Sequence, residues 1–336
     1  MTRVSVIMSV YNSELYLKQA IDSILNQTYK FFEFIIVNDC SNDNSEEIIK
    51  SFTDPRIILI QNEKNLGTAS SLNKSIKLSK GEYLIRMDAD DISLKNRIEE
   101  QVKFMDKNLN IGVAGSFFKL TGEIPWYKKC VLRKGSINQM DSLSKLTFGP
   151  CVLHPSVIIR KKVLIENNVF YDESFKRAQD YELWSRLIFL TNITNIPKNL
   201  FEWRISNNQS SIKDRPKQIT NSKFIHEFIL KKLMGHTPSL RDLEINNWII
   251  SNRILSNKEL LELELYLNKL LICAKSNIIY DQNSLKKEFS NIWMLSCLNS
   301  NLSFKSINIY LNSNLGSINN IKLKNILVFI KKIFSK

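Results

Sequence analysis

Short apolar runs alternate with amphipathic stretches over the first ninety residues of the chain. The apolar runs are rich in Val and Ile, which is typical of strands buried on both faces of a parallel sheet. They occupy residues 4–10, 34–37, 57–60 and 83–87. The stretches between them, 14–26, 46–52 and 69–78, carry apolar residues at helical spacing. Because the connections are short, the pattern predicts a β-α-β-α-β-α-β unit with right-handed crossovers.

The fourth apolar run leads directly into Asp88, Asp90 and Asp91, with only Ala89 between the first two. A buried strand cannot hold this much like charge, so we expect the acids at its carboxyl end, where ligands bind in open α/β sheets. Asp88 and Asp90 point to the same side while the backbone is extended. Two such oxygen ligands suit Mg²⁺ or Mn²⁺, and therefore a diphosphate. Asp91 and Ser93 are also expected to cap the helix that follows.

Composition narrows the class of protein. The 336 residues are 43% hydrophobic and carry a net charge of +14, which favours a polyanionic partner such as nucleic acid, anionic lipid or a phosphorylated substrate. The five cysteines are scattered without a C-x-x-C motif, which indicates a reduced, cytosolic protein without structural zinc. No signal-peptide pattern or spanning apolar run is present, so we expect a cytoplasmic protein, soluble or peripheral to a membrane. Neither G-x-G-x-x-G nor a P-loop occurs, so phosphate would be held by a metal.

Six motifs occur in order along the chain. They are VSVIMSVYN (4–12), VNDCSND (37–43), NLG (65–67), GEYLIRMDADD (81–91), LHPSVIIRK (153–161) and AQDYELW (178–184). Together they resemble the family 2 glycosyltransferases of the kind that build bacterial surface polysaccharides. The resemblance covers roughly residues 3–210. It implies an α/β GT-A fold, a Rossmann-like and mostly parallel sheet flanked by helices, over residues 1–215. Residues 216–336 would then form a C-terminal α-helical extension.

The resemblance implies a nucleotide site. Its residues would be Val10, Tyr11, Asn12, Asp39, Asn65, Gly67, Arg86, Asp88 and Ala89. Asp39 would accept a hydrogen bond from the nucleobase, as a carboxylate can from the imide N–H of uracil. The alternative is an Asx turn or helix cap at Asp39. This chain has Ser9 and Cys40 where the family usually has a proline and a glycine, which leaves the base preference open.

The resemblance also assigns the metal and the charges beside it. Asp90 would ligate Mn²⁺ or Mg²⁺ directly, and Asp88 would contact the ribose or join the metal shell. A metal at this position stabilises charge on the leaving diphosphate. Arg86, a cation within an apolar strand, would reach the phosphate or Asp88, or else form an ordinary strand salt bridge.

Gln179 and Asp180 stand where the family usually has Glu-Asp, so Asp180 matches the catalytic base. It would take a proton from the acceptor hydroxyl as that oxygen attacks the anomeric carbon, and one displacement inverts the centre. The alternative is that Asp180 caps a helix over residues 181–190. Donor or acceptor candidates are Asp91, His154, Gln179, Trp184 and Arg204. Arg204 could face the diphosphate, while Ser206 replaces a family histidine.

Outside these motifs, two segments carry aromatic or basic residues. Trp126 and Tyr127 could stack on a sugar ring, although we expect them to be packed in the interior. Residues 256–259 read as a capping box that starts a leucine-rich helix. Residues 321–336 combine one apolar face with five lysines and no acid, which favours contact with a membrane surface over packing on the domain.

We therefore predict an inverting, metal-dependent glycosyltransferase. It would move a sugar from a UDP-sugar to a saccharide acceptor, lipid-linked, at the inner face of the cytoplasmic membrane during surface-polysaccharide synthesis. A dTDP-sugar donor such as dTDP-rhamnose is the alternative, because thymine offers Asp39 the same imide. A catalytically silent homologue is the third possibility. Nucleic acid is not expected as a partner, because no recognition motif occurs and the acidic triplet repels phosphate unless it holds a metal.

Overall fold

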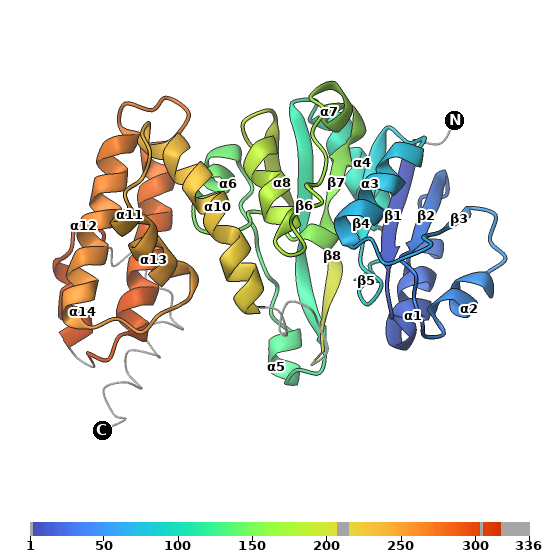
Figure 1. Ribbon diagram of the computed structural model, residues 1–336, viewed down its shortest axis with the longest axis horizontal. Helices are drawn as coiled ribbons and strands as arrows, with labels where there is room; N and C mark the ends of the chain where they lie inside the picture. The colour runs from blue at the N-terminus through green and yellow to red at the C-terminus, as the bar shows by residue number, and fades with distance from the viewer. Residues whose placement is uncertain (1–2, 207–214, 303–304, 317–336) are drawn as a thin grey trace. The chain divides into compact units, whose positions relative to one another are not determined.

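The structure is a computed structural model that describes residues 3–206, 215–302 and 305–316, with residues 215–220 described as backbone only (Figure 1). The chain forms two compact units. The first comprises Met1–Ser142 and Pro150–Gln218, and the second comprises Leu143–Gly149 and Ile219–Lys336.

The first unit is an eight-stranded sheet with flanking helices. Its strands are β1 (Val4–Val10), β2 (Phe32–Asn38), β3 (Ile57–Gln61), β4 (Tyr83–Met87), β5 (Ile92–Ser93), β6 (Ile111–Gly122), β7 (Ile158–Arg160) and β8 (Asn192–Ile205). Its helices are α1 (Glu14–Leu25), α2 (Ser45–Lys50), α3 (Thr68–Leu78), α4 (Arg97–Lys107), α5 (Trp126–Lys129), α7 (Lys161–Glu166), α8 (Gln179–Leu187) and the 3₁₀ helix η1 (His154–Ser156). Helix α6 (Gln139–Leu146) runs from the first unit into the second.

The strand order is β3-β2-β1-β4-β7-β6-β8-β5. Strands β1 to β4 are mutually parallel, as the alternating sequence pattern predicts. Strand β7 is antiparallel to both β4 and β6, and β8 is parallel to β6. It follows that β4, β6 and β8 end at the same edge of the sheet, and that η1 enters β7 from that edge. The observed architecture is an α/β sheet flanked by helices with a helical C-terminal region, as the sequence predicts.

Two helices cover one face of the parallel half and a third covers the other. Tyr83, Ile85 and Met87 of β4 face the apolar cluster that includes side chains of α1 and α4. The alternate β4 residues, Leu84 and Arg86, point to the opposite face, and α3 packs on that face against β1 and β2. Each fully buried aliphatic side chain contributes on the order of 1.5–3 kcal/mol, so this core fixes the register of β4 and with it the position of the residues that follow.

The second unit is helical. It contains α10 (Arg215–Met234), most of which lies in this unit, α11 (Leu240–Ile250), α12 (Asn257–Ala274), α13 (Gln282–Asn299) and α14 (Lys305–Asn312). The predicted capping box at 256–259 is confirmed, because Ser256 and Glu259 exchange side-chain and backbone hydrogen bonds. Ser239 and Asp242 cap α11 in the same way. Among the helices that the structure describes, none is both long enough and apolar enough to cross a membrane.

A short piece of the connection between β6 and β7 belongs to the helical unit. Residues Leu143–Gly149 pack with the helices that follow residue 219. His226 of α10 lies with Nδ1 3.3 Å from the Thr147 carbonyl oxygen, and the Phe148 and Phe289 rings meet edge-to-face with centroids 5.5 Å apart. The segment is thus an interior part of the helical unit although its chain neighbours belong to the sheet.

One local expectation was wrong. Asp91 and Ser93 do not cap the next helix, because Ile92–Ser93 form β5 against β8 and the helix begins only at Arg97, after Asn96. Strand β7 begins only at Ile158, because Pro155 lies in a 3₁₀ turn that must end first.

Candidate active site

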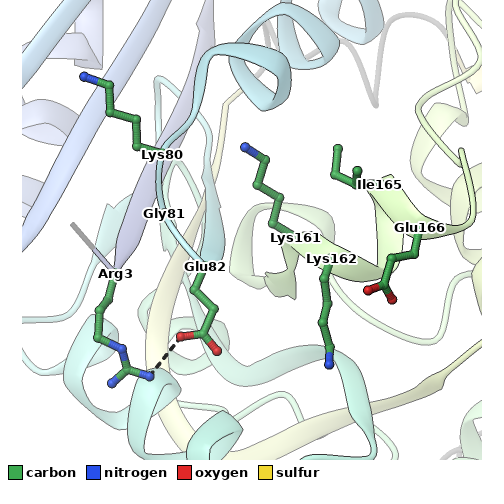
Figure 2. Close-up of a pocket in the computed structure, with 8 residues that line it drawn as sticks. All are labelled: Arg3, Lys80, Gly81, Glu82, Lys161, Lys162, Ile165 and Glu166. Atoms are coloured by element: carbon green, nitrogen blue, oxygen red, sulfur yellow. Dashed lines mark hydrogen bonds and ion pairs between the residues drawn. The ribbon is translucent and has the colours of Figure 1, made fainter. Parts of the chain in front are cut away.

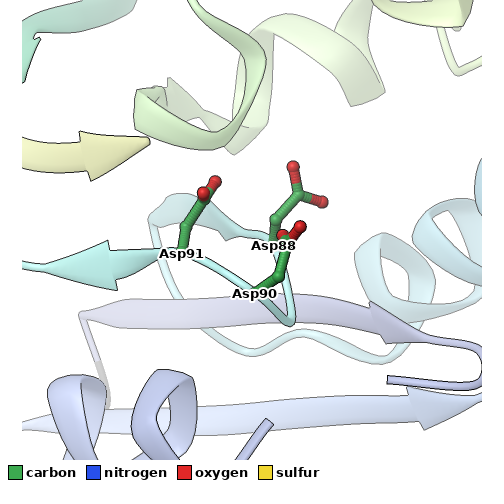
Figure 3. A group of neighbouring side chains, drawn as sticks. All are labelled: Asp88, Asp90 and Asp91. Carbon is green, nitrogen blue, oxygen red and sulfur yellow. The ribbon is translucent and has the colours of Figure 1, made fainter. Parts of the chain in front are cut away.

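The three carboxylates of Asp88, Asp90 and Asp91 lie together in the loop between β4 and β5 (Figure 3). Each residue offers an oxygen, and these three oxygens lie within 4.8 Å of one another. The buried strand β4 ends at Met87, so the loop begins where the chain leaves the core. The arrangement gathers hard oxygen ligands at the carboxyl edge of the sheet, where the sequence pattern predicts them.

Asp91 is the most enclosed of the three. One oxygen, Oδ1, accepts a hydrogen bond of 2.7 Å from the Arg204 backbone N–H, whereas the other, Oδ2, is buried without a hydrogen-bond partner. Burial, with Asp88 and Asp90 adding to it, raises the pKa of Asp91 well above its usual value, while the Arg204 N–H and Arg86 act to lower it. A buried acceptor without a donor is uncommon, and a cation between the three carboxylates would satisfy it.

Arg204 holds the acidic loop in place. Its Nε donates to the Asp90 carbonyl oxygen at 2.6 Å, and one terminal nitrogen donates to Gln19 Oε1 at 2.8 Å. The guanidinium also lies over the Tyr16 ring, 4.1 Å from its centroid. The side chain of Arg204 therefore binds the loop backbone and α1, and the prediction that it faces a diphosphate stays a prediction.

Arg86 forms an ion pair with Asp88, and its side chain is almost completely buried. Its Nε and its other terminal nitrogen, Nη1, are buried without hydrogen-bond partners. Of the readings open from the sequence, the contact with Asp88 is the one observed. The same guanidinium acts electrostatically on Asp180, Tyr171 and His154, so it is a central positive charge of the site.

Asp180 lies in the first turn of α8, across the site from the acidic loop. Burial raises the pKa of Asp180 and the charge of Asp88 adds to this, while the Tyr181 backbone N–H and Arg86 act to lower it. Asp180 does not occupy the cap position, which is taken by Ala178 in a left-handed conformation with φ of 62°. Backbone strain of this kind is held in place by surrounding contacts, and it frequently occurs at functional sites. Gln179, beside Asp180, is half-buried.

The carboxylate of Asp39 is buried at the end of β2 and organises the NLG loop. Its Oδ1 accepts from the Asn62 side chain at 2.8 Å and from the Leu66 N–H at 2.9 Å, and its Oδ2 accepts from the Gly67 N–H at 2.8 Å. The turn and cap bonds that we considered for Asp39 are made instead by Asn38 and Asp43. A carboxylate has about four acceptor positions, so Asp39 can still accept from a nucleobase.

The turn after β1 lies beside this loop. Tyr11 is about half exposed, while Val10 is fully buried. Asn12 accepts from the Asn42 N–H at 2.9 Å, which joins the two loops. Cys40 has φ of 61°, a left-handed conformation that glycine adopts at lower cost than a residue with a Cβ atom. Of the remaining predicted nucleotide residues, Asn65 is exposed and Ala89 is buried between the acids.

His154 and Trp184 lie deeper than a sugar contact would suggest. The His154 Nε2 is 2.7 Å from the Tyr171 hydroxyl oxygen, and burial lowers the pKa of His154 well below its usual value. Trp184 has no exposed surface and meets the His154 ring edge-to-face. Trp184 therefore packs against the inner side of the His154 ring. Of these two residues, only His154 has exposed surface with which to contact a ligand.

Two residues that position the site were not singled out from the sequence. Asn73 on α3 donates to the Tyr171 carbonyl oxygen at 2.9 Å and accepts from the Tyr171 N–H at 3.1 Å, which ties α3 to the segment that leads to Asp180. Arg97 is fully buried on α4 and donates to the carbonyl oxygens of Arg86 and Pro155 at 2.8 and 2.9 Å. A polar residue on the buried face of a helix was the only signal available for either.

Trp126 and Tyr127 contradict the expectation that they are packed inside. Their residues are 76% and 56% exposed, and the two rings contact each other edge-to-face. They lie on α5, directly after β6, at the same edge of the sheet as the acidic loop.

An open hollow occurs at the opposite edge of the sheet, at the amino ends of β1 and β4 (Figure 2). Its lining includes Arg3, Lys80, Lys162 and Glu82. Arg3 is already paired with Glu82 and Asp106, at 3.1 and 2.8 Å. The hollow lies away from the carboxyl edge, so we do not assign the chemistry to it.

Comparisons with known proteins define the class of enzyme as a glycosyltransferase with the GT-A fold. Among solved structures, S. aureus TarS 1–349 in complex with UDP-GlcNAc superposes with a TM-score of 0.59 at 17% identity, covering 88% of this chain and 90% of that one. The mannosyltransferase PcManGT from Pyrobaculum calidifontis, in complex with GDP-Man and Mn²⁺, superposes with a TM-score of 0.51 at 12% identity, covering 99% and 87%.

Sequence comparisons identify the family. The profile described as Glycosyl transferase family 2 matches residues 5–167. An uncharacterized glycosyltransferase of Methanocaldococcus jannaschii is 38% identical over 224 residues, which cover 64% of this chain and 75% of that relative. This chain belongs to the family 2 glycosyltransferases, which confirms the resemblance seen in its motifs.

Proposed function

We propose that this enzyme transfers a sugar, with inversion, from a UDP-sugar to a hydroxyl group of a lipid-linked saccharide in surface-polysaccharide synthesis. The proposal is supported above all by two sets of carboxylates that lie at one edge of the sheet. Three carboxylates converge after β4, and a further carboxylate, Asp180, with a raised pKa stands on α8 within the field of Arg86. Metal-assisted departure of a diphosphate and general-base activation of a hydroxyl require these two groups.

The carboxylates after β4 fit a divalent metal. Asp88, Asp90 and Asp91 supply hard oxygen ligands that lie close together. The Oδ2 atom of Asp91 receives no hydrogen bond, and a bound cation would give it a partner. This donor set suits Mn²⁺ or Mg²⁺. Such an ion, when bound, neutralises charge that develops on the leaving diphosphate. We propose Asp90 as the direct ligand, with Asp88 as a co-ligand held in place by Arg86.

The proton is moved by the protein. Asp180 would accept the proton of the acceptor hydroxyl while that oxygen forms a bond to the anomeric carbon and the bond from that carbon to the diphosphate oxygen breaks. The raised pKa of Asp180 makes it a stronger base than an ordinary aspartate once it is ionised. Arg86 keeps the ionised form accessible, because its positive charge opposes the effect of burial.

The nucleobase would lie at Asp39. The bonds from Leu66 and Gly67 fix this carboxylate at the carboxyl end of β2, where its remaining acceptor capacity can serve an imide N–H. That TarS binds UDP-GlcNAc on a similar fold supports a uracil donor. Thymine offers the same imide, so a dTDP-sugar remains the second candidate.

Calorimetric titration with UDP, dTDP, GDP and CDP, each with Mn²⁺ and with chelator, tests the donor proposal. We expect Mn²⁺-dependent binding of UDP and no binding of GDP or CDP. Asp90→Ala should abolish the Mn²⁺ dependence, whereas Asp106→Ala, a carboxylate at the other edge of the sheet, should preserve it. Binding of dTDP in preference to UDP would shift the donor to a deoxysugar nucleotide. Equal UDP binding by Asp90→Ala with Mn²⁺ would refute the metal assignment.

A peripheral position at the inner face of the cytoplasmic membrane is part of the same proposal. The basic segment 321–336, on which the sequence places this contact, lies outside the described residues.

A further inference from the structure

An aromatic surface is exposed at the carboxyl edge of the sheet, the edge at which the acidic loop lies. Trp126 and Tyr127 of α5 are 76% and 56% exposed, and Val131 just after the helix is 46% exposed. We call these three residues, with Lys128 and Lys129 beside them, the α5 surface. Aromatic side chains carry large apolar areas that globular proteins normally bury, and contiguous exposed patches of this kind mark interaction sites.

The chain segment that carries the α5 surface is strongly basic. Residues 124–134 contain four cations, at positions 128, 129, 133 and 134, and no acid. None of the four forms an ion pair with any residue that the structure describes, whereas exposed lysines elsewhere do, as Lys103 does with Glu99 at 2.7 Å. Unpaired positive charge around exposed aromatic rings complements an anionic surface.

The α5 surface is joined to the acidic loop between β4 and β5 through β6 and β8. Gly122, at the end of β6, pairs with Ile205, and the Glu123 N–H donates to the Ile205 carbonyl oxygen at 2.9 Å. Ile205 follows Arg204, which binds the backbone of Asp90 and the side chain of Asp91. Helix α5 therefore begins a few residues from the strand that fixes the acidic loop, and both belong to the first unit.

We propose that the α5 surface docks on an anionic lipid bilayer. Trp126 and Tyr127 would lie in the headgroup region, and the neighbouring lysines would contact lipid phosphates. Trp and Tyr favour this interface because one part of each ring system is apolar and another is polar, and lysines contribute through the negative surface potential. Docking there would bring the catalytic edge to an acceptor carried on lipid. The membrane position and the lipid-borne acceptor belong to the proposed function, whereas the assignment of the contact to α5 rests on the exposure and charge of this surface.

Charge decides between a bilayer and other occupants. A neutral saccharide would use the aromatic rings but would leave the four cations unmatched. An anionic bilayer matches both the rings and the charges, because it offers an apolar layer beneath a layer of phosphates.

Tryptophan fluorescence of the full-length protein measures insertion directly. Trp184, Trp248 and Trp293 are buried and Trp203 is partly buried, so Trp126 is the tryptophan that acyl chains can reach. We expect vesicles of brominated phosphatidylglycerol to quench part of the emission in the wild type. The quenching should be lost in Trp126→Phe and should be much weaker with vesicles of brominated phosphatidylcholine.

Sedimentation with phosphatidylglycerol vesicles measures affinity. Each lysine near an anionic surface is worth about fivefold in binding, so K128Q/K129Q should lower the partition coefficient roughly 25-fold. W126A/Y127A should lower it more than tenfold. The matched control is K80Q/K162Q, which removes the same charge from the hollow at the opposite edge (Figure 2) and should leave partitioning within about twofold. Residues 321–336 are present in every variant, so their contribution cancels.

Two results would overturn this inference. The first is equal sedimentation of the α5 variants, the control and the wild type, together with no quenching. The second is unchanged vesicle binding combined with lost transfer to a soluble saccharide acceptor, which would make the α5 surface a sugar platform. UDP binding in Mn²⁺ is measured on the same samples. Its retention in the α5 variants separates a failure of the membrane contact from a failure of the proposed donor chemistry.

Discussion

Replacing Asp91 by asparagine should stabilise the metal-free protein. Asp91 is buried beside two other carboxylates, and one of its oxygens has no hydrogen-bond partner. Asparagine has nearly the same shape, and its carbonyl can accept the bond from the Arg204 N–H. Its amide can donate to the neighbouring carboxylates, so the change turns repulsion into hydrogen bonding.

The size of the effect follows from the separations. Two carboxylates 4.8 Å apart, the upper limit in this cluster, repel by about 3.5 kcal/mol at an effective dielectric constant of about 20. Asp91 takes part in two such pairs, but protonation and the opposite charge of Arg86 relieve part of the repulsion. We therefore expect a net gain of about 1–3 kcal/mol. For a unit of this size that corresponds to an increase of roughly 2–10 °C in Tm.

The pH dependence has a definite sign. The pKa of Asp91 is raised in the folded protein, so protonated Asp91 is favoured by folding. The stability that this provides is complete below the unfolded pKa and is lost as the pH rises through the folded pKa. The advantage of Asp91→Asn over the wild type in chelator should therefore grow as the pH increases across this window.

Differential scanning calorimetry in chelator and in Mn²⁺ provides the measurement. Mn²⁺ should raise the Tm of the wild type more than that of Asp91→Asn, because ligand binding stabilises the folded state and the variant binds the metal less tightly. Asp106→Asn is the matched control with the opposite sign. Arg3 lowers the pKa of Asp106, so neutralising it should reduce stability. A lower Tm for Asp91→Asn in chelator, or an equal response to Mn²⁺, would refute the reasoning.

Three further predictions concern the base, its support and the nucleobase loop. Asp180→Asn should lower kcat by roughly 10²–10⁴ without changing UDP affinity. The acidic limb of the wild-type pH–rate profile should lie above the usual pKa of aspartate, because burial raises the pKa of Asp180. An unaffected kcat would exclude Asp180 as the base. Asn73→Ala leaves the Tyr171 backbone N–H and carbonyl unpaired, at about 2–4 kcal/mol. We expect its kcat to fall while the Kd for UDP, measured by calorimetry, stays constant; an equal loss in both would point to general unfolding. Cys40→Gly removes the left-handed strain at φ of 61° and should raise stability by about 0.5–1 kcal/mol in urea denaturation; a loss would show that the contact of the thiol with the Glu63 carbonyl oxygen matters more.

Features that depend on neighbouring residues in the chain were predictable. The strands β1 to β4 follow from short apolar runs, which can be recognised without knowing any distant partner. The acidic loop follows because three acids after a buried strand have few places to go. The family motifs add the expected roles of Asp39 and Asp180, which stay predictions until ligand binding is measured.

Features that depend on distant pairing were not predictable. Strand β5 exists because Ile92 and Ser93 pair with Glu202 and Phe201, more than a hundred residues away. The hydrogen bonds between Asn73 and Tyr171 join residues about as far apart in the sequence, and a lone asparagine in a helix gives no indication of its partner. The exposure of Trp126 was missed for another reason. Hydrophobic character alone predicts burial, whereas the structure shows that the residues it describes leave Trp126 76% exposed.

The assignment of Leu143–Gly149 to the helical unit has a consequence for engineering and for divergence within the family. The connection between β6 and β7 leaves and re-enters the sheet at the catalytic edge, so it can change without disturbing the nucleotide half. Part of that connection is nonetheless an interior component of the helices after residue 219. A chimera that exchanges only the connection would place a foreign segment in the core of an unchanged helical unit. The exchangeable module is therefore discontinuous in sequence, and the two segments should be inherited, or transplanted, together.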